Sequence, residues 1–262
     1  MTVTEPAAGP NPVMPPPPHT LAVDIGGSGF KAAVLAVDGS MLSERLRIDT
    51  PYPCPPETFI EAIGELAALV PVPYDRVSVG FPGLVRGGNV LMVPSLSRLT
   101  YLGDPDPGMS ERWKGFALAA ELERTFAHPV KVANDADVQG CAVVQGKGLE
   151  FVMTLGTGCG TALFHDGVLL PHLELGHAPF RKGETFEDQI NNASRKVVGN
   201  SRWSQRVLKA IDAYHQFLFF DHMYIGGGNS KHIDVPLPPN ATIVPNTAGI
   251  LGGIKLWDLD AS

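Results

Sequence analysis

Two stretches of the chain share one pattern of apolar and polar positions. Residues 21–37, LAVDIGGSGFKAAVLAV, contain an apolar run, a glycine-rich turn and a second apolar run, and the dipeptide Asp-Gly follows. Residues 151–170, FVMTLGTGCGTALFHDGVLL, repeat this order, again with Asp-Gly after the second run. Because Asp-Gly beside apolar runs is a strong hairpin signal, each stretch predicts two strands around a glycine turn. The repeat indicates an internal duplication.

The remaining pattern predicts a mixture of helices and strands. Apolar residues three or four positions apart, such as Phe59, Ile63 and Leu66, indicate amphipathic helices, and short apolar runs indicate strands. On this basis we predict helices at residues 57–70 and 116–126, strands at residues 77–79, 130–132 and 243–245, a long irregular segment at residues 84–115, buried runs at residues 217–220 and 223–225, and a last helix that opens at residues 246–253.

Composition limits the class of protein. The 262 residues are 44% hydrophobic and 18% charged, which is typical of a soluble globular chain with one large domain or two small ones. The net charge of −7 argues against nucleic-acid binding, and no apolar run is long enough to span a membrane. Three cysteines without a C-x-x-C pair argue for a reducing compartment, so we expect a cytoplasmic protein. Residues 1–19 are rich in proline, and we expect a disordered tail.

The first glycine-rich turn has the chemistry of an anion site. Glycines let backbone N–H groups gather around a phosphate. Ser28 adds a hydroxyl donor, Lys31 adds a point charge, and Asp24 offers a hard oxygen that suits Mg²⁺. An ordinary tight hairpin is the alternative. Neither glycine turn is a Walker A motif or a dinucleotide fingerprint, because each leads into a strand and neither contains Gly-Lys-Ser/Thr at the required spacing.

A carboxylate-rich block follows the strand predicted at residues 130–132. Its sequence is Asn-Asp-Ala-Asp, and it enters a predicted helix at a position where side chains face a cleft. Asn134 can bind sugar hydroxyls, and Asp135 can accept a proton from an attacking hydroxyl. Helix capping is the alternative for both residues, because Asn and Asp are good N-caps. We expect Asp137 to be structural.

These blocks together resemble a known family. DIGGSGFK, the turn Gly-Phe-Pro-Gly at residues 80–83, Asn-Asp-Ala-Asp, LGTGCG and Glu-Leu-Gly-His at residues 174–177 resemble, in this order, the family of repressors, open-reading-frame kinases and sugar kinases (ROK). Within it the chain is most similar to polyphosphate glucokinases. The resemblance covers about residues 21–257. It implies an α/β, duplicated ribonuclease-H-like fold of the actin and hexokinase type, with two lobes around a central cleft.

The resemblance also implies roles for individual residues. Asp135 would be the catalytic base, and Asp24 would place Mg²⁺ directly or through water. A plain strand-ending turn remains the alternative for Gly83, and Ser95 stands where relatives carry Asn. The implied sugar-binding residues are Asn134, Glu174, His177, Glu187, Ser95 and Gly83. The implied phosphate-binding residues are Asp24, Gly26, Gly27, Ser28, Gly29, Lys31, Gly156, Thr157, Gly158, Gly227 and Gly228.

Two further features of the sequence bear on metal binding and on the phosphate donor. Relatives that bind zinc carry a C-x-C-G-x-x-G-C run after the histidine, whereas residues 178–187 contain no cysteine, so we predict no zinc. Residues 181–209 hold seven basic residues against three acidic ones. We predict that basic residues here, among them Arg195, Lys196, Arg202 and Arg206, form a track for a polyanion, and a solvated helix surface is the alternative.

We therefore predict a Mg²⁺-dependent glucokinase that uses polyphosphate, ATP or both. The rivals are an ATP-dependent hexose kinase, a non-catalytic sugar sensor and a hydrolase of ATP or polyphosphate. We predict a small lobe at residues 20–133 with a returning helix at residues 247–262, a large lobe at residues 134–246, and a homodimer that binds neither nucleic acid nor membrane.

Overall fold

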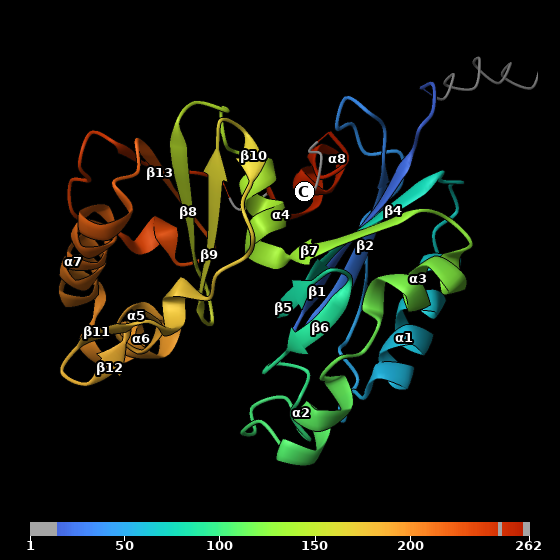
Figure 1. Ribbon diagram of the computed structural model, residues 1–262, viewed down its shortest axis with the longest axis horizontal. Helices are drawn as coiled ribbons and strands as arrows, with labels where there is room; N and C mark the ends of the chain where they lie inside the picture. Colours follow the sequence, from blue (N-terminus) through green and yellow to red (C-terminus); the bar gives the residue numbers. More distant parts are fainter. Residues whose placement is uncertain (1–14, 246–247, 259–262) are drawn as a thin grey trace, which may run out of the picture.

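The computed structural model describes residues 15–245 and 248–258, which form two five-stranded sheets with matching strand orders (Figure 1). The first sheet has the order β3-β2-β1-β4-β7, and the second has the order β10-β9-β8-β13-β14. In each sheet an antiparallel hairpin pairs with two parallel strands. The predicted duplication is therefore confirmed.

The strands of the first sheet are β1 (Thr20–Gly26), β2 (Gly29–Leu35), β3 (Leu46–Ile48), β4 (Arg76–Phe81) and β7 (Val130–Asn134). Those of the second are β8 (Leu149–Leu155), β9 (Cys159–His165), β10 (Val168–Leu169), β13 (His222–Gly226) and β14 (Ala241–Ile243).

Helices cover both faces of each sheet. Helices α1 (Pro56–Ala68) and α3 (Leu118–Phe126) lie on the outer face of the first sheet, and α7 (Asn200–Leu218) lies on the outer face of the second (Figure 1). Helices α4 (Asp135–Cys141) and α8 (Ala248–Lys255) lie between the two sheets. Short elements complete the description: β5 (Leu84–Arg86), β6 (Asn89–Met92), α2 (Pro107–Trp113), β11 (Pro179–Arg181), β12 (Glu184–Thr185), α5 (Phe186–Ile190), α6 (Asn192–Val198) and the 3₁₀ turns at Leu175–His177 and Ser230–His232.

The core of the first half shows why α1 forms as predicted. Phe59, Ile63 and Leu66 recur on one face of the helix, and each is fully buried. Burying one such side chain contributes about 1.5–3 kcal/mol. Phe59 also meets Phe81 and Trp113 edge-on, with ring centroids 5.8 and 5.5 Å apart. This aromatic cluster packs α1 against strand β4 and helix α2.

Helix α8 packs closely on α4 and on the first sheet. A Cβ at Gly252 would lie only 1.6 Å from the carbonyl oxygen of Val138, so this helix crossing tolerates no side chain there. The hydroxyl of Ser78 on β4 donates to the carbonyl of Gly253 at 2.5 Å and accepts from the indole N–H of Trp257 at 2.8 Å. These contacts join the end of the described chain to the inner face of the first sheet.

Three of our predictions were wrong. The strand predicted at residues 243–245 is instead β14 (Ala241–Ile243), because residues 241–243 are the ones that pair with β13. Residues 84–115 are not irregular throughout: Gly87 and Gly88, at φ of 56° and 77°, turn β5 into β6, and Asp106 caps α2 by accepting from the backbone N–H of Met109 at 2.8 Å. The run at residues 217–220 is only partly buried. Phe217 and Phe219 are 52% and 74% exposed, because α7 ends at Leu218 and turns these rings outward.

Other predictions reach beyond the described part of the chain. Residues 1–14 of the predicted tail and residues 246–247 of the predicted last helix lie outside it. The lobe boundaries at residues 20, 134 and 247 remain a proposal. None of the described helices is long and apolar enough to cross a bilayer.

Candidate active site

The first glycine turn, residues 26–29, joins β1 to β2, and side chains from residues 47–52 support it. Three of its four carbonyls accept a side-chain hydrogen bond: Gly26 from the Thr50 hydroxyl at 2.6 Å, Gly27 from the Tyr52 hydroxyl at 2.8 Å, and Ser28 from the Arg47 guanidinium at 2.7 Å. Because these carbonyl oxygens are already paired, they repel an incoming anion less than bare oxygens would. The sequence analysis did not identify these three supporting residues.

Charged side chains surround the same turn. Lys31 Nζ lies 3.1 Å from Asp24 Oδ2, as expected from residues that face each other on paired strands. The Arg45 guanidinium approaches the same carboxylate oxygen at 3.8 Å, and Arg47 pairs with Asp49 at 2.7 Å. Thus the predicted residues Asp24 and Lys31 are brought together, and two unpredicted arginines join them.

Asp135 is the first residue of α4, directly after β7. Its predicted neighbour Asn134 caps this helix, because its side-chain oxygen accepts from the backbone N–H of Ala136 at 2.8 Å. The Asn134 amide also donates to the carbonyl of Gly83 at 3.1 Å, so these two predicted sugar residues touch. The capping alternative therefore holds for Asn134, and its sugar-binding role stays a prediction.

The surroundings of Asp135 suit a base that works near neutral pH. Burial and, next in size, the nearby carboxylate of Asp24 raise the pKa of Asp135 to about 7. A base is most effective when its pKa is close to the working pH. Asp24 comes from the first half of the chain, and Asp135 begins the helix between the two sheets.

A buried chain of three charged side chains lies beside this base. His172 Nδ1 is 2.9 Å from Asp137 Oδ1, its Nε2 is 3.5 Å from Glu174 Oε1, and its side chain is only 5% exposed. Burial lowers the pKa of His172, but the two carboxylates outweigh this effect and raise it to about 9. Burial raises the pKa of Glu174, whereas His172 outweighs burial and lowers it. The expectation that Asp137 is structural agrees with this burial, but a lone His172 gave no signal in the sequence.

The second glycine turn, residues 156–160, joins β8 to β9. The Glu187 carboxylate accepts from the backbone N–H of Cys159 at 2.9 Å and lies beside Gly158. The carbonyl of Gly156 accepts from the Asn229 side-chain amide at 2.9 Å. This bond connects the second turn to the third, residues 226–229, where Gly227 has a φ of 84° beside Leu155. Thr157 is exposed at the tip of the second turn.

Three contacts place further parts of the predicted site. A Cβ at Gly160 would lie 3.0 Å from that of Ala136, so the second turn reaches the start of α4. The backbone N–H of His177 donates to the carbonyl of Glu174 at 3.0 Å in a 3₁₀ turn, which leaves the His177 side chain exposed. Ser95 is tied to the first turn through its carbonyl, which lies 3.0 Å from the Tyr52 hydroxyl.

Comparison with known proteins agrees with this geometry. The sequence pattern of the ROK family matches residues 20–190. The chain is 30% identical to the polyphosphate glucokinase of Mycobacterium tuberculosis (strain ATCC 25618 / H37Rv), over 96% of both chains. The chain belongs to the ROK family. All five ordered motif blocks lie within the matched residues.

Solved structures of ROK proteins share the fold. The inorganic polyphosphate/ATP-glucomannokinase from Arthrobacter sp. strain KM superposes with a TM-score of 0.75 at 30% identity, over 90% of this chain and 96% of that one. A ROK family glucokinase from Streptomyces griseus, in complex with glucose and AMPPNP, gives a TM-score of 0.70 at 18% identity, over 91% and 98%. The chain therefore has the two-lobed actin and hexokinase type of fold that we predicted.

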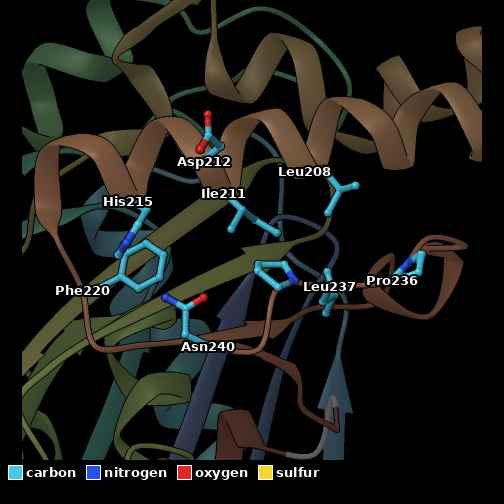
Figure 2. Close-up of a pocket in the computed structure, with 9 residues that line it drawn as sticks. Leu208, Ile211, Asp212, His215, Phe220, Pro236, Leu237 and Asn240 are labelled. Carbon is cyan, nitrogen blue, oxygen red and sulfur yellow. The ribbon is translucent and has the colours of Figure 1, made fainter.

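Two cavities lie in the second half of this ROK protein. One, of about 390 Å³, lies between α7 and the segment that precedes β14, and no predicted site residue lines it (Figure 2). The other, of about 420 Å³, is lined by Gly227 and Gly228 of the third turn together with Ser230, Lys231 and residues 243–245. Only the second cavity adjoins a predicted phosphate-binding turn.

Proposed function

We propose that the protein is a glucokinase that transfers a phosphoryl group from inorganic polyphosphate to the 6-hydroxyl of glucose, with ATP as a further donor. The main observation behind this proposal is that Asp135, a base of raised pKa, lies within the influence of Asp24, whose carboxylate contacts the cations beside the first glycine turn. Two relatives, a polyphosphate glucokinase and a polyphosphate/ATP-glucomannokinase, support the choice of donor and sugar.

In the proposed reaction Asp135 accepts the proton of the glucose 6-hydroxyl. The hydroxyl oxygen forms a bond to the terminal phosphorus of the donor, and the bond from that phosphorus to its bridging oxygen breaks. The products are glucose 6-phosphate and a donor shortened by one phosphate. Because phosphoryl transfer depends on positioning and charge neutralisation, Asp135 needs accurately held partners on both sides.

Different residues of the site would hold the sugar and the donor phosphates. We propose that Glu174 and His177 bind vicinal sugar hydroxyls, with Asn134, Glu187, Ser95 and Gly83 around them. The three glycine turns would hold the donor phosphates, with Lys31 beside the first. Closure around the sugar would exclude water and so prevent hydrolysis of the donor.

Magnesium fits the carboxylates of this site. Mg²⁺ usually takes one or two protein carboxylates and completes its shell with water and substrate phosphates, and Asp24 with Asp135 nearby offers such a set. Asp24 would hold the ion directly or through water. When bound, the ion would neutralise charge on the donor phosphates. Within the described residues, no group of three or more His, Cys, Asp and Glu side chains is placed to hold a metal ion. The absence of zinc stays a prediction, and metal analysis of the purified protein tests it.

The deciding experiment is a coupled assay for hexose 6-phosphate. Glucose, mannose and N-acetyl sugars are each offered with ATP and with polyphosphate. We expect turnover of glucose with polyphosphate. Turnover with ATP alone would identify an ATP-dependent hexose kinase, donor breakdown without sugar phosphate would identify a hydrolase, and sugar binding without turnover would identify a sensor.

We also propose a homodimer in the cytoplasm. The cysteines Cys54, Cys141 and Cys159 are all buried free thiols, which supports a reducing compartment. Light scattering after size-exclusion chromatography tests the dimer. A monomeric mass at micromolar concentration would reject it.

A further inference from the structure

A row of charged side chains crosses the first sheet from the base toward the sheet edge. In the strand register, Arg47 of β3 lies opposite Lys31 of β2. Lys31 lies opposite Asp24 of β1, and Asp24 lies opposite Gly80 of β4. Directly opposed residues on neighbouring strands point to the same face of a sheet. Arg45 lies two residues before Arg47, and its contact with Asp24 places it on this face as well.

The inner end of this row lies at the proposed base. Gly80 has no side chain, and a Cβ there would lie 3.7 Å from the Cα of Asp135. The face that carries Asp24, Lys31 and Arg47 is therefore the face toward Asp135. From β1 to β3 the row covers two strand spacings, about 10 Å, and β3 is the edge strand of the sheet.

The cations in this row remain open to solvent. Lys31, Arg45 and Arg47 side chains are 31%, 47% and 49% exposed. Their carboxylate partners engage only some of the donors, because a guanidinium carries five N–H groups. The absence of a side chain at Gly29 allows Arg47 to lie over the first glycine turn: a Cβ there would be 2.7 Å from Arg47 Nε. Arg47 thus reaches from the turn to the sheet edge.

The basic residues of the second half are placed differently. Arg195 donates to Asn192 and Asn200, and Arg206 donates to Ser194, so these two guanidinium groups hold α6 and α7 together. Lys196 and Arg202 are exposed on the same two helices. This arrangement fits the solvated helix surface better than a track for a polyanion.

We propose that Lys31, Arg45 and Arg47, called here the β3 strip, bind the distal phosphates of a linear polyphosphate whose terminal phosphate lies at the first glycine turn. This inference rests on the proposed function. A chain of phosphates carries charge along its whole length and matches a row of cations. Distal phosphates exist only in a long polyphosphate, whereas the few phosphates of ATP would lie at the first turn, so the strip adds more affinity for a long polyphosphate than for ATP.

The test compares two double variants that remove the same charge. Arg45→Gln with Arg47→Gln removes two cations from the β3 strip, and Lys196→Gln with Arg202→Gln removes two from α6 and α7. Binding of long-chain polyphosphate and of ATP is titrated in an Asp135→Asn background, in which turnover does not interfere. We expect the strip variant to weaken polyphosphate binding about tenfold and to lower the salt slope of its binding by about 1.4. ATP binding should weaken less than polyphosphate binding, because ATP loses only the Arg47 support of the first turn, and the α6–α7 control should leave both donors unchanged.

The outcomes separate the strip from the proposed function. Unchanged polyphosphate binding in the strip variant overturns the strip, and so does a larger loss in the control. An equal loss for ATP also overturns it, because Arg47 would then only support the turn. Absence of wild-type turnover with polyphosphate, by contrast, rejects the proposed function whatever the binding titrations give.

Discussion

The first and second glycine turns occupy equivalent places in the two sheets, yet different side chains hold them. Around the first turn, a hydroxyl from Thr50, a hydroxyl from Tyr52 and a guanidinium from Arg47 donate to the backbone carbonyls. Around the second, the Asn229 amide donates to one carbonyl, and the Glu187 carboxylate accepts from a backbone N–H. The first turn is thus lined by cations and the second by a carboxylate.

This difference indicates that the duplicated unit has specialised. Cations beside the first turn favour the negatively charged donor. The Glu187 carboxylate beside the second turn can accept hydrogen bonds from sugar hydroxyls, while the backbone N–H groups of that turn are proposed to hold a donor phosphate. Asp135 begins the helix between the two sheets and is influenced by the first half through Asp24. We expect variants of the cations around the first turn to affect the donor, and variants of the buried histidine and carboxylates of the second half to affect the sugar.

The largest effect should come from the residue shared by both halves. Asp135→Asn keeps the shape of the side chain but removes the proton acceptor. Because base catalysis is typically worth ~10²–10⁴ in rate, kcat should fall by that factor. Glucose binding, measured by calorimetry, should be nearly unchanged. If the variant kept more than about a tenth of wild-type kcat, Asp135 would not be the base.

The pH profile tests the electrostatics at this shared position. The carboxyl of Asp135 must lose its proton to act, so kcat/KM should rise as pH increases through about 7. His172 has a pKa raised to about 9, so its stabilising charge is fully present below its ordinary pKa of about 6.5 and is lost as pH rises through about 9. We expect a bell-shaped profile with limbs near these two values, measured at saturating Mg²⁺. A flat profile between pH 6 and 8 would contradict the raised pKa of Asp135.

What could be predicted from the sequence depends on whether the signal was local. The glycine turns and Asp135 stand in short motifs, and the resemblance placed them in the correct fold. The donors to the first turn could not be predicted, because Tyr52 bonds with Gly27 from 25 residues away and nothing in its own segment indicates that partner. His172 was missed because its partner Asp137 lies 35 residues away on another element. Helix α2 did have a local signal, the capping dipeptide Asp106-Pro107, which the long loop-like segment obscured.

Variants of His172 test the sugar half alone. Asn places its amide near the Nδ1 position and keeps a donor toward Asp137, whereas Gln reaches the Nε2 position and keeps a donor toward Glu174. His172→Asn removes the 3.5 Å ion pair between Nε2 and Glu174. Because breaking a buried ion pair leaves an uncompensated charge, we expect the glucose KM to rise by about tenfold or more. His172→Gln should raise it less, and the donor KM should change little in both.

One control and one further readout make this comparison specific. His165→Asn removes a histidine whose side chain is 62% exposed, and it should leave the glucose KM unchanged. Both His172 variants should lose the alkaline limb of the pH profile, since the titrating group is gone. Equal glucose KM values in His172→Asn, His172→Gln and the wild type would show that His172 does not position Glu174.

The smallest predicted effect concerns the connection between the first glycine turn and the segment that carries Ser95, a predicted sugar-binding residue. The Tyr52 hydroxyl lies 2.8 Å from the carbonyl of Gly27 in the first turn and 3.0 Å from the carbonyl of Ser95. One hydroxyl proton can serve only one carbonyl at a time, so the bond that it makes depends on how close the two segments are. A ligand that shifts either segment therefore changes the environment of the other, which is a coupling free energy between the two sites.

Tyr52→Phe removes this hydroxyl and keeps the ring. A net hydrogen bond is worth about 0.5–1.5 kcal/mol, so the factor by which ATP tightens glucose binding should fall by about two- to tenfold. The factor is measured by glucose titrations with and without ATP in the Asp135→Asn background. Tyr101→Phe is the matched control, because the Tyr101 ring lies 6.2 Å from that of Tyr52 and is about half exposed. An undiminished factor in Tyr52→Phe would mean that the two segments respond to their ligands independently, and the coupling would then have to pass through Asp135 and helix α4.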